Sequence, residues 1–155
     1  MTQTPAPERL LCDTSFVGHV GARRARPERY RHWDEQALQR VDRAIISISV
    51  VTLAEARFGY LNAGWGQRRI DDEERRLGSF LQIPLDYPDL DEWARLRHLS
   101  GQQGWAMSDN DLWIAATAST RRYALVTCDK DQLRLDSDLP VEVVYFPPQP
   151  DASTS

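Results

Sequence analysis

The sequence has few cysteines, almost no lysine and no long hydrophobic stretch, and these shortages exclude several classes of protein. Cys12 and Cys128 are the two cysteines, and no CxxC or Cys/His spacing surrounds them, which excludes a disulfide framework and an ordinary zinc site. No run approaches the roughly 18 apolar residues of a membrane helix, so we expect no membrane contact. The first residues lack the basic start and apolar stretch of a secretory signal, and we therefore expect a cytoplasmic protein.

Lysine is almost absent: of the 19 basic residues, Lys130 alone is a lysine. The net charge is −4, which is not typical of a protein that binds nucleic acid. One segment, 23–31, nevertheless holds five arginines against a single acid, Glu28. Because arginine binds phosphate in a bidentate manner, this segment is a candidate phosphate-binding surface, and a solvated arginine face is the alternative. Its members are Arg23, Arg24, Arg26, Arg29 and Arg31.

Short apolar runs rich in β-branched residues alternate with segments of helical periodicity. Strands are predicted at 9–13, 43–50, 82–86, 123–129 and 141–146, with helices between them. This alternation is typical of an α/β protein in which a parallel sheet carries helices on both faces. We predict a single domain over residues 9–146. The proline-rich or polar ends, 1–8 and 147–155, are expected to be flexible tails.

Two aspartates follow predicted strands, and two further acids open predicted helices. Asp13 and Asp129 stand where two of the strands end. Glu55 and Asp111 are expected in the first turn of a helix. In open parallel sheets, ligand sites lie beyond the carboxyl ends of the strands, where the following helices also begin. We therefore expect these four acids at one edge of the sheet.

Each of these acids also has a purely structural interpretation. Ser108 with Asp111 matches a capping box, as does Thr52 with Glu55. The two aspartates after strands suit a helix cap and a turn. Four carboxylates at one edge would nevertheless repel one another and raise their pKa values, and a divalent cation would remove that repulsion. Magnesium and manganese prefer carboxylate and water oxygens, so we predict a metal site suited to phosphodiester cleavage.

A family resemblance is carried by four segments, which read LLCDTSFV, SVVTLAEARFGYL, SDNDLWIAATA and LVTCDKD. They occur in the order and spacing of PIN-domain ribonucleases, and the chain resembles the toxin of a VapBC-type toxin–antitoxin pair from about Leu10 to Phe146. The resemblance implies a PIN-like three-layer α/β/α fold with a mostly parallel sheet of about five strands. It further implies a Mg²⁺- or Mn²⁺-dependent endoribonuclease of a type II system that hydrolyses RNA to 5′-phosphate and 3′-hydroxyl ends. A VapB-type antitoxin would inhibit it, and homodimers are common among such toxins.

The resemblance also implies roles for individual residues. The family's catalytic and metal-binding acids map onto Asp13, Glu55, Asp111 and Asp129, and its supporting hydroxyl residues map onto Thr14, Ser15 and Thr127. The usual acid–phenylalanine pair is replaced by Asp131 and Gln132, so both Asp129 and Asp131 stand as candidates for the fourth acid. The arginines of segment 23–31 would then contact RNA phosphates.

Two other functions are compatible with the same fold. One is a non-catalytic PIN-fold protein that binds a partner or RNA, although binding gains nothing from clustered carboxylates. The other is a PIN nuclease of RNA processing without an antitoxin. A dehalogenase-like phosphatase is excluded because it needs an acid where Ser15 stands, and no glycine fingerprint for a dinucleotide follows the first strand.

The two cysteines each precede an aspartate, which raises the question of a redox role. We expect reduced, buried thiols. The alternative is that Cys12 and Cys128 lie side by side, so that oxidation would disturb Asp13 and Asp129 together.

Overall fold

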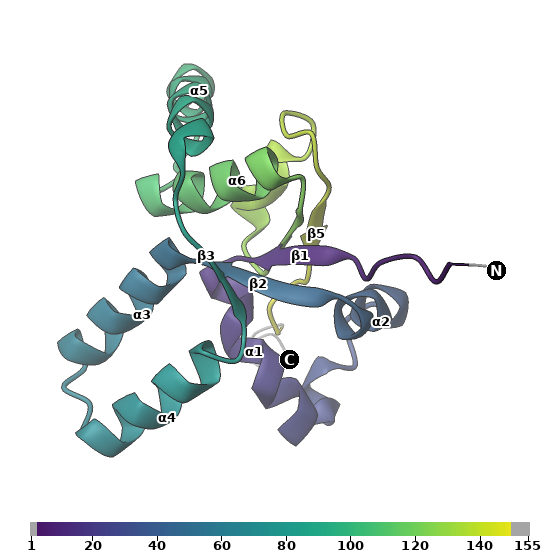
Figure 1. Cartoon of the computed structure of the whole chain (residues 1–155), viewed down its shortest axis with the longest axis vertical. Helices are drawn as coiled ribbons and strands as arrows, with labels where there is room; N and C mark the ends of the chain where they lie inside the picture. Colours follow the sequence, from purple (N-terminus) through teal and green to yellow (C-terminus); the bar gives the residue numbers. More distant parts are fainter. Residues whose placement is uncertain (1–2, 150–155) are drawn as a thin grey trace, which may run out of the picture.

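The computed structural model describes residues 3–149 and contains a five-stranded sheet between two layers of helices (Figure 1). The strand order is β3-β2-β1-β4-β5, and every neighbouring pair is parallel. The strands are β1 (Arg9–Cys12), β2 (Ile45–Ser49), β3 (Leu81–Ile83), β4 (Ala124–Thr127) and β5 (Val143–Tyr145). The three-layer α/β fold predicted from the sequence is confirmed.

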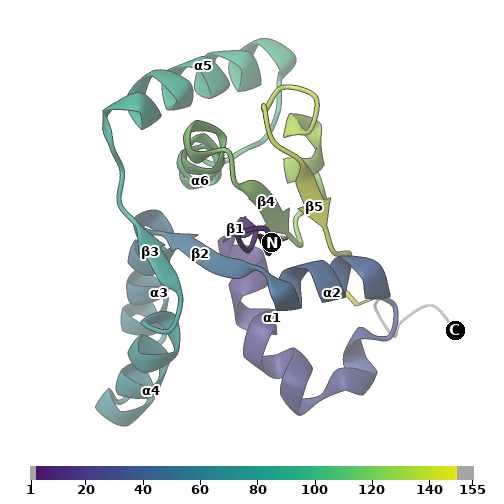
Figure 2. The ribbon, with the colours of Figure 1, turned by 45° about the vertical axis from the view of Figure 1, so that its right-hand side comes forward.

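Helices cover both faces of this sheet. The first face carries α1 (Thr14–Ala25), α2 (Glu35–Arg43), α3 (Val50–Asn62) and α4 (Gln67–Leu77), with a short 3₁₀ helix, η1 (Pro27–Tyr30), after α1. The opposite face carries α5 (Tyr87–Gln103) and α6 (Asp109–Arg121), which lie above the sheet in Figure 2. A second 3₁₀ helix, η2 (Lys130–Leu135), follows β4 and precedes β5.

The central strand β1 contributes to the hydrophobic core on both of its faces. Leu10 and Cys12 pack in the core that β1 shares with α1 and α2, whereas Leu11 packs in the core beneath α5 and α6. All three side chains are fully buried. Because side chains alternate along a strand, Asp13 lies on the same side as Leu11, toward α6. The strand thus places a carboxylate directly after three fully buried apolar residues.

The helices α3 and α4 form a hairpin that extends away from the sheet in both views (Figures 1 and 2). Glu74 of α4 holds the two helices together, since it accepts hydrogen bonds from Arg57 Nε (3.0 Å) and from the Tyr60 hydroxyl. On the outer surface of α3, Phe58 and Leu61 are 69% and 73% exposed. These two apolar side chains lie within one helical turn and point to solvent.

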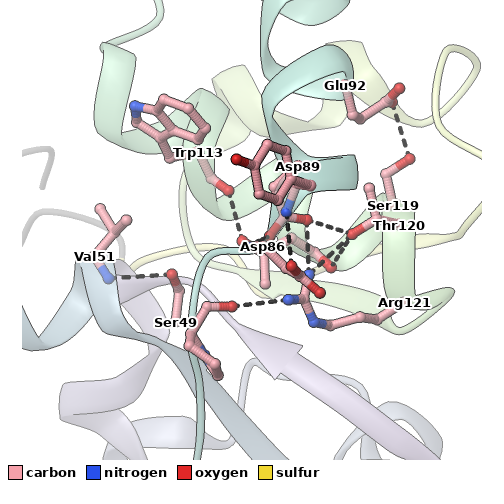
Figure 3. A network of polar contacts seen from close by, with 12 residues as sticks. Ser49, Val51, Asp86, Asp89, Glu92, Trp113, Ser119, Thr120 and Arg121 are labelled. Atoms are coloured by element: carbon pink, nitrogen blue, oxygen red, sulfur yellow. Dashed lines mark hydrogen bonds and ion pairs between the residues drawn. The ribbon is translucent and has the colours of Figure 1, made fainter.

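A buried aspartate fastens α5 to α6 (Figure 3). The carboxylate of Asp89 is fully buried and accepts hydrogen bonds from the backbone N–H of Asp86 (2.7 Å), from Thr120 Oγ1 (2.5 Å) and from Arg121 Nη1 (2.7 Å). Burial on its own would raise the pKa of Asp89, but these hydrogen bonds outweigh it and hold the pKa below its usual range.

Both ends of the described chain are attached to the domain. The Glu8 carbonyl accepts a hydrogen bond from the backbone N–H of Ile45 (2.8 Å), and the Pro147 carbonyl accepts one from the Trp33 indole (2.6 Å). These two residues of the predicted tails are therefore fixed, while 1–2 and 150–155 lie outside the described residues. Within 3–149, no helix has both the length and the apolar character needed to cross a membrane.

Candidate functional site

Asp13 follows β1 and continues its pairing with β4. Its backbone N–H donates to the Val126 carbonyl at 2.8 Å, which fixes the residue at the carboxyl edge of the sheet. Its side chain is 2% exposed, and Oδ2 accepts hydrogen bonds from Ser15 Oγ (2.8 Å) and Thr127 Oγ1 (2.9 Å). Asp13 occupies the N-cap position of α1, as the sequence suggested, but its side chain makes no capping hydrogen bond there.

The hydroxyls of Ser15 and Thr127 connect Asp13 to the segment that carries Asp129. Ser15 Oγ accepts the backbone N–H of Cys128 (3.0 Å), and Thr127 Oγ1 accepts the backbone N–H of Asp129 (3.0 Å). Each hydroxyl has one proton, which it donates to Asp13. The 3.2 Å approach of the two hydroxyl oxygens is therefore a contact and not a further hydrogen bond. This arrangement fixes Asp13 and the start of the β4–η2 connection in one unit.

Glu55 reaches the site from α3, although not from the position that the sequence suggested. The helix begins at Val50, and Ser49 is its N-cap, with Ser49 Oγ accepting the Val51 N–H at 3.1 Å. Glu55 therefore lies in the second turn, and both its predicted place in the first turn and its capping box with Thr52 are wrong. The prediction failed because Ser49 stands three residues earlier and takes the capping role.

Thr14, the first residue of α1, holds the Glu55 carboxylate. Thr14 Oγ1 donates to Glu55 Oε1 at 2.8 Å and lies 3.0 Å from Thr52 Oγ1. Since the Thr14 proton is directed to Glu55, Thr52 donates to Thr14. Two threonines from different helices thus orient one carboxylate.

Asp111 and Asp129 come from α6 and from the segment after β4, and Asp111 is close enough to Asp13 and Asp129 to feel their charges. Ser108 caps α6 by accepting the Asp111 N–H at 3.1 Å, so this half of the predicted capping box is present. Asp129 is the N-cap of η2, and its Oδ1 accepts the Asp131 N–H at 2.9 Å. The carboxylate of Asp131 forms an ion pair with Arg134 (3.5 Å).

The acids interact electrostatically with one another. Burial raises the pKa of Asp13 above its usual range against the lowering effect of Ser15 and Thr127, and the charge of Glu55 raises it further. Burial likewise raises the pKa of Asp111, with additional contributions from the charges of Asp13 and Asp129. The four predicted acids form no salt bridge with any residue of 3–149. The site therefore carries excess negative charge that the described residues do not neutralise.

The donor set fits a hard divalent cation, although the ligands are not gathered into a finished cage. Within 3–149, no three histidine, cysteine, aspartate or glutamate side chains converge as a group that could hold a metal ion. Asp13 Oδ1, however, is buried and has no hydrogen-bond partner among the described residues. A buried carboxylate oxygen without a partner is costly, and a cation would satisfy it. Since all the donors are oxygens, they suit a hard cation.

The arginine segment lies apart from the acids. The helix α1 starts beside Asp13 and has 12 residues, which corresponds to about 18 Å. Arg23 lies in its last turn and pairs with Asp42 at the end of α2. The other arginines of 23–31 are exposed and form no ion pair with residues 3–149. The structure therefore does not bring this segment and the acids together.

The two cysteines are free thiols in one core. Cys12 is fully buried, Cys128 is half-buried, and both pack in the cluster beneath α1. The strands β1 and β4 are neighbours, but Cys12 pairs with Val126 and not with Cys128. Burial, together with the charge of Asp13, raises the pKa of Cys128 to about 12. The reactive thiolate is therefore scarce, which favours the interpretation as reduced core thiols.

Sequence reasoning missed one residue that belongs to this region. Gln132, at the position where the related pattern has phenylalanine, is fully buried in η2, yet its side-chain amide has no hydrogen-bond partner among the described residues. The departure from the pattern was visible in the sequence, but burial of the amide was not.

The fold and the acid site define a class of protein: the PIN domain family matches residues 10–138, and the chain belongs to that family. Among named relatives, it is homologous to ribonuclease VapC5 of Mycobacterium tuberculosis, with 35% identity over 105 residues, or 64% of this chain and 75% of the relative. Ribonuclease VapC4 of the same organism is 30% identical over 129 residues, or 79% of this chain and 88% of the relative.

Solved structures give the same result. VapBC-5 from Mycobacterium tuberculosis, a member of the VapBC family of toxin–antitoxin systems, aligns with a TM-score of 0.65 and 29% identity, covering 90% of this chain and 100% of the other. VapBC2 from Rickettsia felis, bound to a DNA fragment from its promoter, aligns with a TM-score of 0.66 and 19% identity over 90% and 98% of the two chains. The second likeness shows the fold alone.

Proposed function

We propose that this chain is the toxin of a type II toxin–antitoxin pair and acts as an endoribonuclease with an acidic Mg²⁺ or Mn²⁺ site. One observation carries the proposal: the buried carboxylate of Asp13 has an oxygen with no partner among the described residues, and the charges of neighbouring acids raise the pKa values of Asp13 and Asp111. Named relatives that cover most of the domain are ribonucleases, and a solved relative is a VapBC complex.

In this proposal, Asp13, Glu55, Asp111 and Asp129 hold the metal ion. The ion supplies a Lewis acid that lowers the pKa of water and screens the charge of the scissile phosphate. Ser15 and Thr127 fix one oxygen of Asp13 and leave Oδ1 free for the ion. Thr14 orients Glu55 in the same way from the other side.

The further roles of these residues follow from their contacts. Asp129 is preferred to Asp131 as the fourth acid, because its charge raises the pKa of Asp111 whereas Asp131 pairs with Arg134. Hydrolysis by water would leave a 5′-phosphate and a 3′-hydroxyl, which we expect from the family.

The first experiment is cleavage of total RNA by the purified protein, with manganese and then with EDTA. We expect metal-dependent cleavage that Asp111→Asn abolishes. The matched control is Asp109→Asn, because Asp109 lies in the same helical turn but pairs with Arg97 (3.3 Å) and should be dispensable. Cleavage that persists in EDTA would contradict the metal site.

Two measurements separate the alternatives, the cleavage assay above and a toxicity assay in cells. If wild type and Asp111→Asn are equally inert over a range of RNAs, the non-catalytic PIN-fold binding protein is favoured. If the protein is active and toxic in cells, and no neighbouring gene product relieves that toxicity, a nuclease of RNA processing without an antitoxin is favoured.

We propose that the exposed arginines of segment 23–31 bind RNA phosphates at a distance from the proposed cleavage site. They stand at the far end of α1, and four of them have no ion-pair partner within 3–149. Replacing Arg24, Arg26, Arg29 and Arg31 with glutamine should reduce the salt dependence of RNA binding by about 0.7 in slope for each lost contact. An unchanged slope would show a solvated face, and Arg75→Gln, which breaks a surface pair with Asp72, is the control.

For partners, we propose a VapB-type antitoxin and a homodimer of this chain. The exposed pair Phe58 and Leu61 on α3 gives a surface for protein contact. Light scattering of wild type beside Phe58→Asp tests the dimer: a dimer that the substitution converts to a monomer supports it, and a monomeric wild type overturns it.

A further inference from the structure

Two tryptophans stack between α5 and α6, beside the helical turn that carries Asp111. The ring centroids of Trp93 on α5 and Trp113 on α6 lie 4.7 Å apart, and the ring planes meet at 15°. Both side chains are half-buried. Trp93 Nε1 also donates to the Asp109 carbonyl (3.3 Å) in the first turn of α6. The proposed metal chemistry uses neither ring, so aromatic surface near the acids has no assigned role.

Trp93 lines a hollow of about 530 Å³ along the surface of α5. Gly101, eight residues later in the same helix, also lines it. Glycine is unfavourable inside a helix, yet a Cβ at this position would meet only Arg97 Nη1, at an ordinary contact distance of 3.6 Å. Packing among the described residues therefore does not require glycine here, whereas an open hollow does. The lining residues are Trp93, Ala94, Arg97, His98, Gly101 and Gln102.

Arg97 places a positive charge at this hollow and connects it to α6. Its guanidinium pairs with Asp109 (3.3 Å), and the two side chains are 52% and 65% exposed. Because an exposed pair of this kind contributes little, Arg97 can exchange Asp109 for a phosphate. Trp93 and Arg97 thus both contact Asp109, which stands two residues before Asp111. Side chains two positions apart point to opposite sides of a helix, so the hollow and the acids are separated by about 10 Å, one helix diameter.

We propose that this hollow binds an unpaired base of the RNA substrate, which packs against Trp93 while a neighbouring phosphate pairs with Arg97. The inference rests on the proposed nuclease activity. Aromatic side chains stack with any base, and arginine neutralises the backbone beside it. A base can stack on a side chain only after it leaves its own duplex, so the hollow selects single-stranded RNA. A strand that crosses the N-terminus of α6 reaches both the hollow and the acids.

The first test fills the hollow with Gly101→Leu and leaves the Trp93–Trp113 stack in place. Leucine favours a helix more than glycine, so this variant should be at least as stable as wild type in urea. Cleavage of a single-stranded oligoribonucleotide is measured with Mn²⁺ over a range of substrate concentrations. We expect KM to rise about tenfold, as for one lost base stack, with kcat unchanged. The matched control, Gln103→Leu, is exposed on the same helix outside the hollow and should keep the wild-type KM.

Variants of Trp93 distinguish a base-stacking surface from a contact that serves only the fold. Trp93→Phe keeps an aromatic face and should stay near the wild-type KM, whereas Trp93→Leu should raise KM about tenfold. A contact that serves only the fold would lower urea stability in these variants without changing KM at a temperature where both are folded.

The outcomes separate this inference from the proposed function. A folded Gly101→Leu with the wild-type KM would overturn the inference and leave the nuclease intact, as would equal KM values for the single strand and for its duplex with a complementary strand. Wild type that cleaves no RNA with Mn²⁺ would overturn both. Should Gly101→Leu fail to fold, the comparison of Trp93→Phe with Trp93→Leu decides in its place.

Discussion

Asp13 and Asp89 are both buried aspartates, but the protein treats them in opposite ways. The carboxylate of Asp89 accepts hydrogen bonds from a backbone N–H, a hydroxyl and a guanidinium group, and its pKa lies below the usual range. Asp13 receives two hydroxyls on one oxygen, the other oxygen has no partner among the described residues, and its pKa lies above the usual range. The fully hydrogen-bonded Asp89 serves to hold two helices together, whereas Asp13, with one oxygen left without a partner among the described residues, is suited to bind a ligand.

The largest expected effect tests this contrast through stability. Asp89→Asn leaves the Arg121 guanidinium without its charged partner, and breaking such a buried pair should lower the free energy of unfolding by about 3 kcal/mol. Asp13→Asn removes a charge that burial disfavours and should leave stability equal or higher in EDTA. Urea unfolding of both variants beside wild type measures the difference. An equal loss in both would make Asp13 a structural residue.

The same measurement repeated over pH sharpens the comparison, because the two shifts have opposite signs. The pKa of Asp89 is lowered on folding, so its stabilisation is complete above the unfolded value, about 4, and is lost as the pH falls through the folded value. The gap between wild type and Asp89→Asn should therefore close in acid. The pKa of Asp13 is raised, so wild type should lose stability relative to Asp13→Asn as the pH rises above about 4. Parallel curves would contradict both assignments.

The contrast also explains what the sequence could predict. Strand ends in a parallel sheet are set by the alternation of strands and helices, so the placement of Asp13 and Asp129 at one edge followed from the chain order. That their strands, β1 and β4, are neighbours came only from the structure. Their roles, and those of Glu55 and Asp111, stay predictions. Helix starts were less certain, because Ser49 and Thr52 are both suitable caps, and only the packed structure shows that Ser49 is used.

Long-range hydrogen bonds could not be predicted from the sequence. Asp89 belongs to a local capping box with Asp86, but its other partners, Thr120 and Arg121, are about 30 positions away. The distance between the arginine segment and the acids depends on the length of α1, which continues to Ala25. Local sequence patterns thus predict which acids lie at the carboxyl edge of the sheet. Tertiary packing decides which carboxylates obtain hydrogen-bond or ion-pair partners.

The smallest expected effect compares one hydroxyl from each region. Ser15→Ala removes a donor to Asp13 (2.8 Å), and Ser119→Ala removes a donor to Glu92 (2.9 Å), a second contact between α5 and α6 (Figure 3). Ser119→Ala should cost about 1 kcal/mol in the free energy of unfolding, the usual value for one hydrogen bond. Ser15→Ala should cost at least as much, because Ser15 Oγ also accepts the Cys128 N–H.

The two serine variants should differ in RNA cleavage. Ser15 orients the carboxylate that we propose as a metal ligand, so Ser15→Ala should lower cleavage about tenfold, as loss of an outer partner does at other metal sites. Ser119→Ala should cleave as wild type does at a temperature where both variants are folded. Equal activities at equal stability would show that the hydroxyls around Asp13 serve only the fold. The distinction between a satisfied and a receptive buried aspartate would then rest on the free Oδ1 of Asp13 alone.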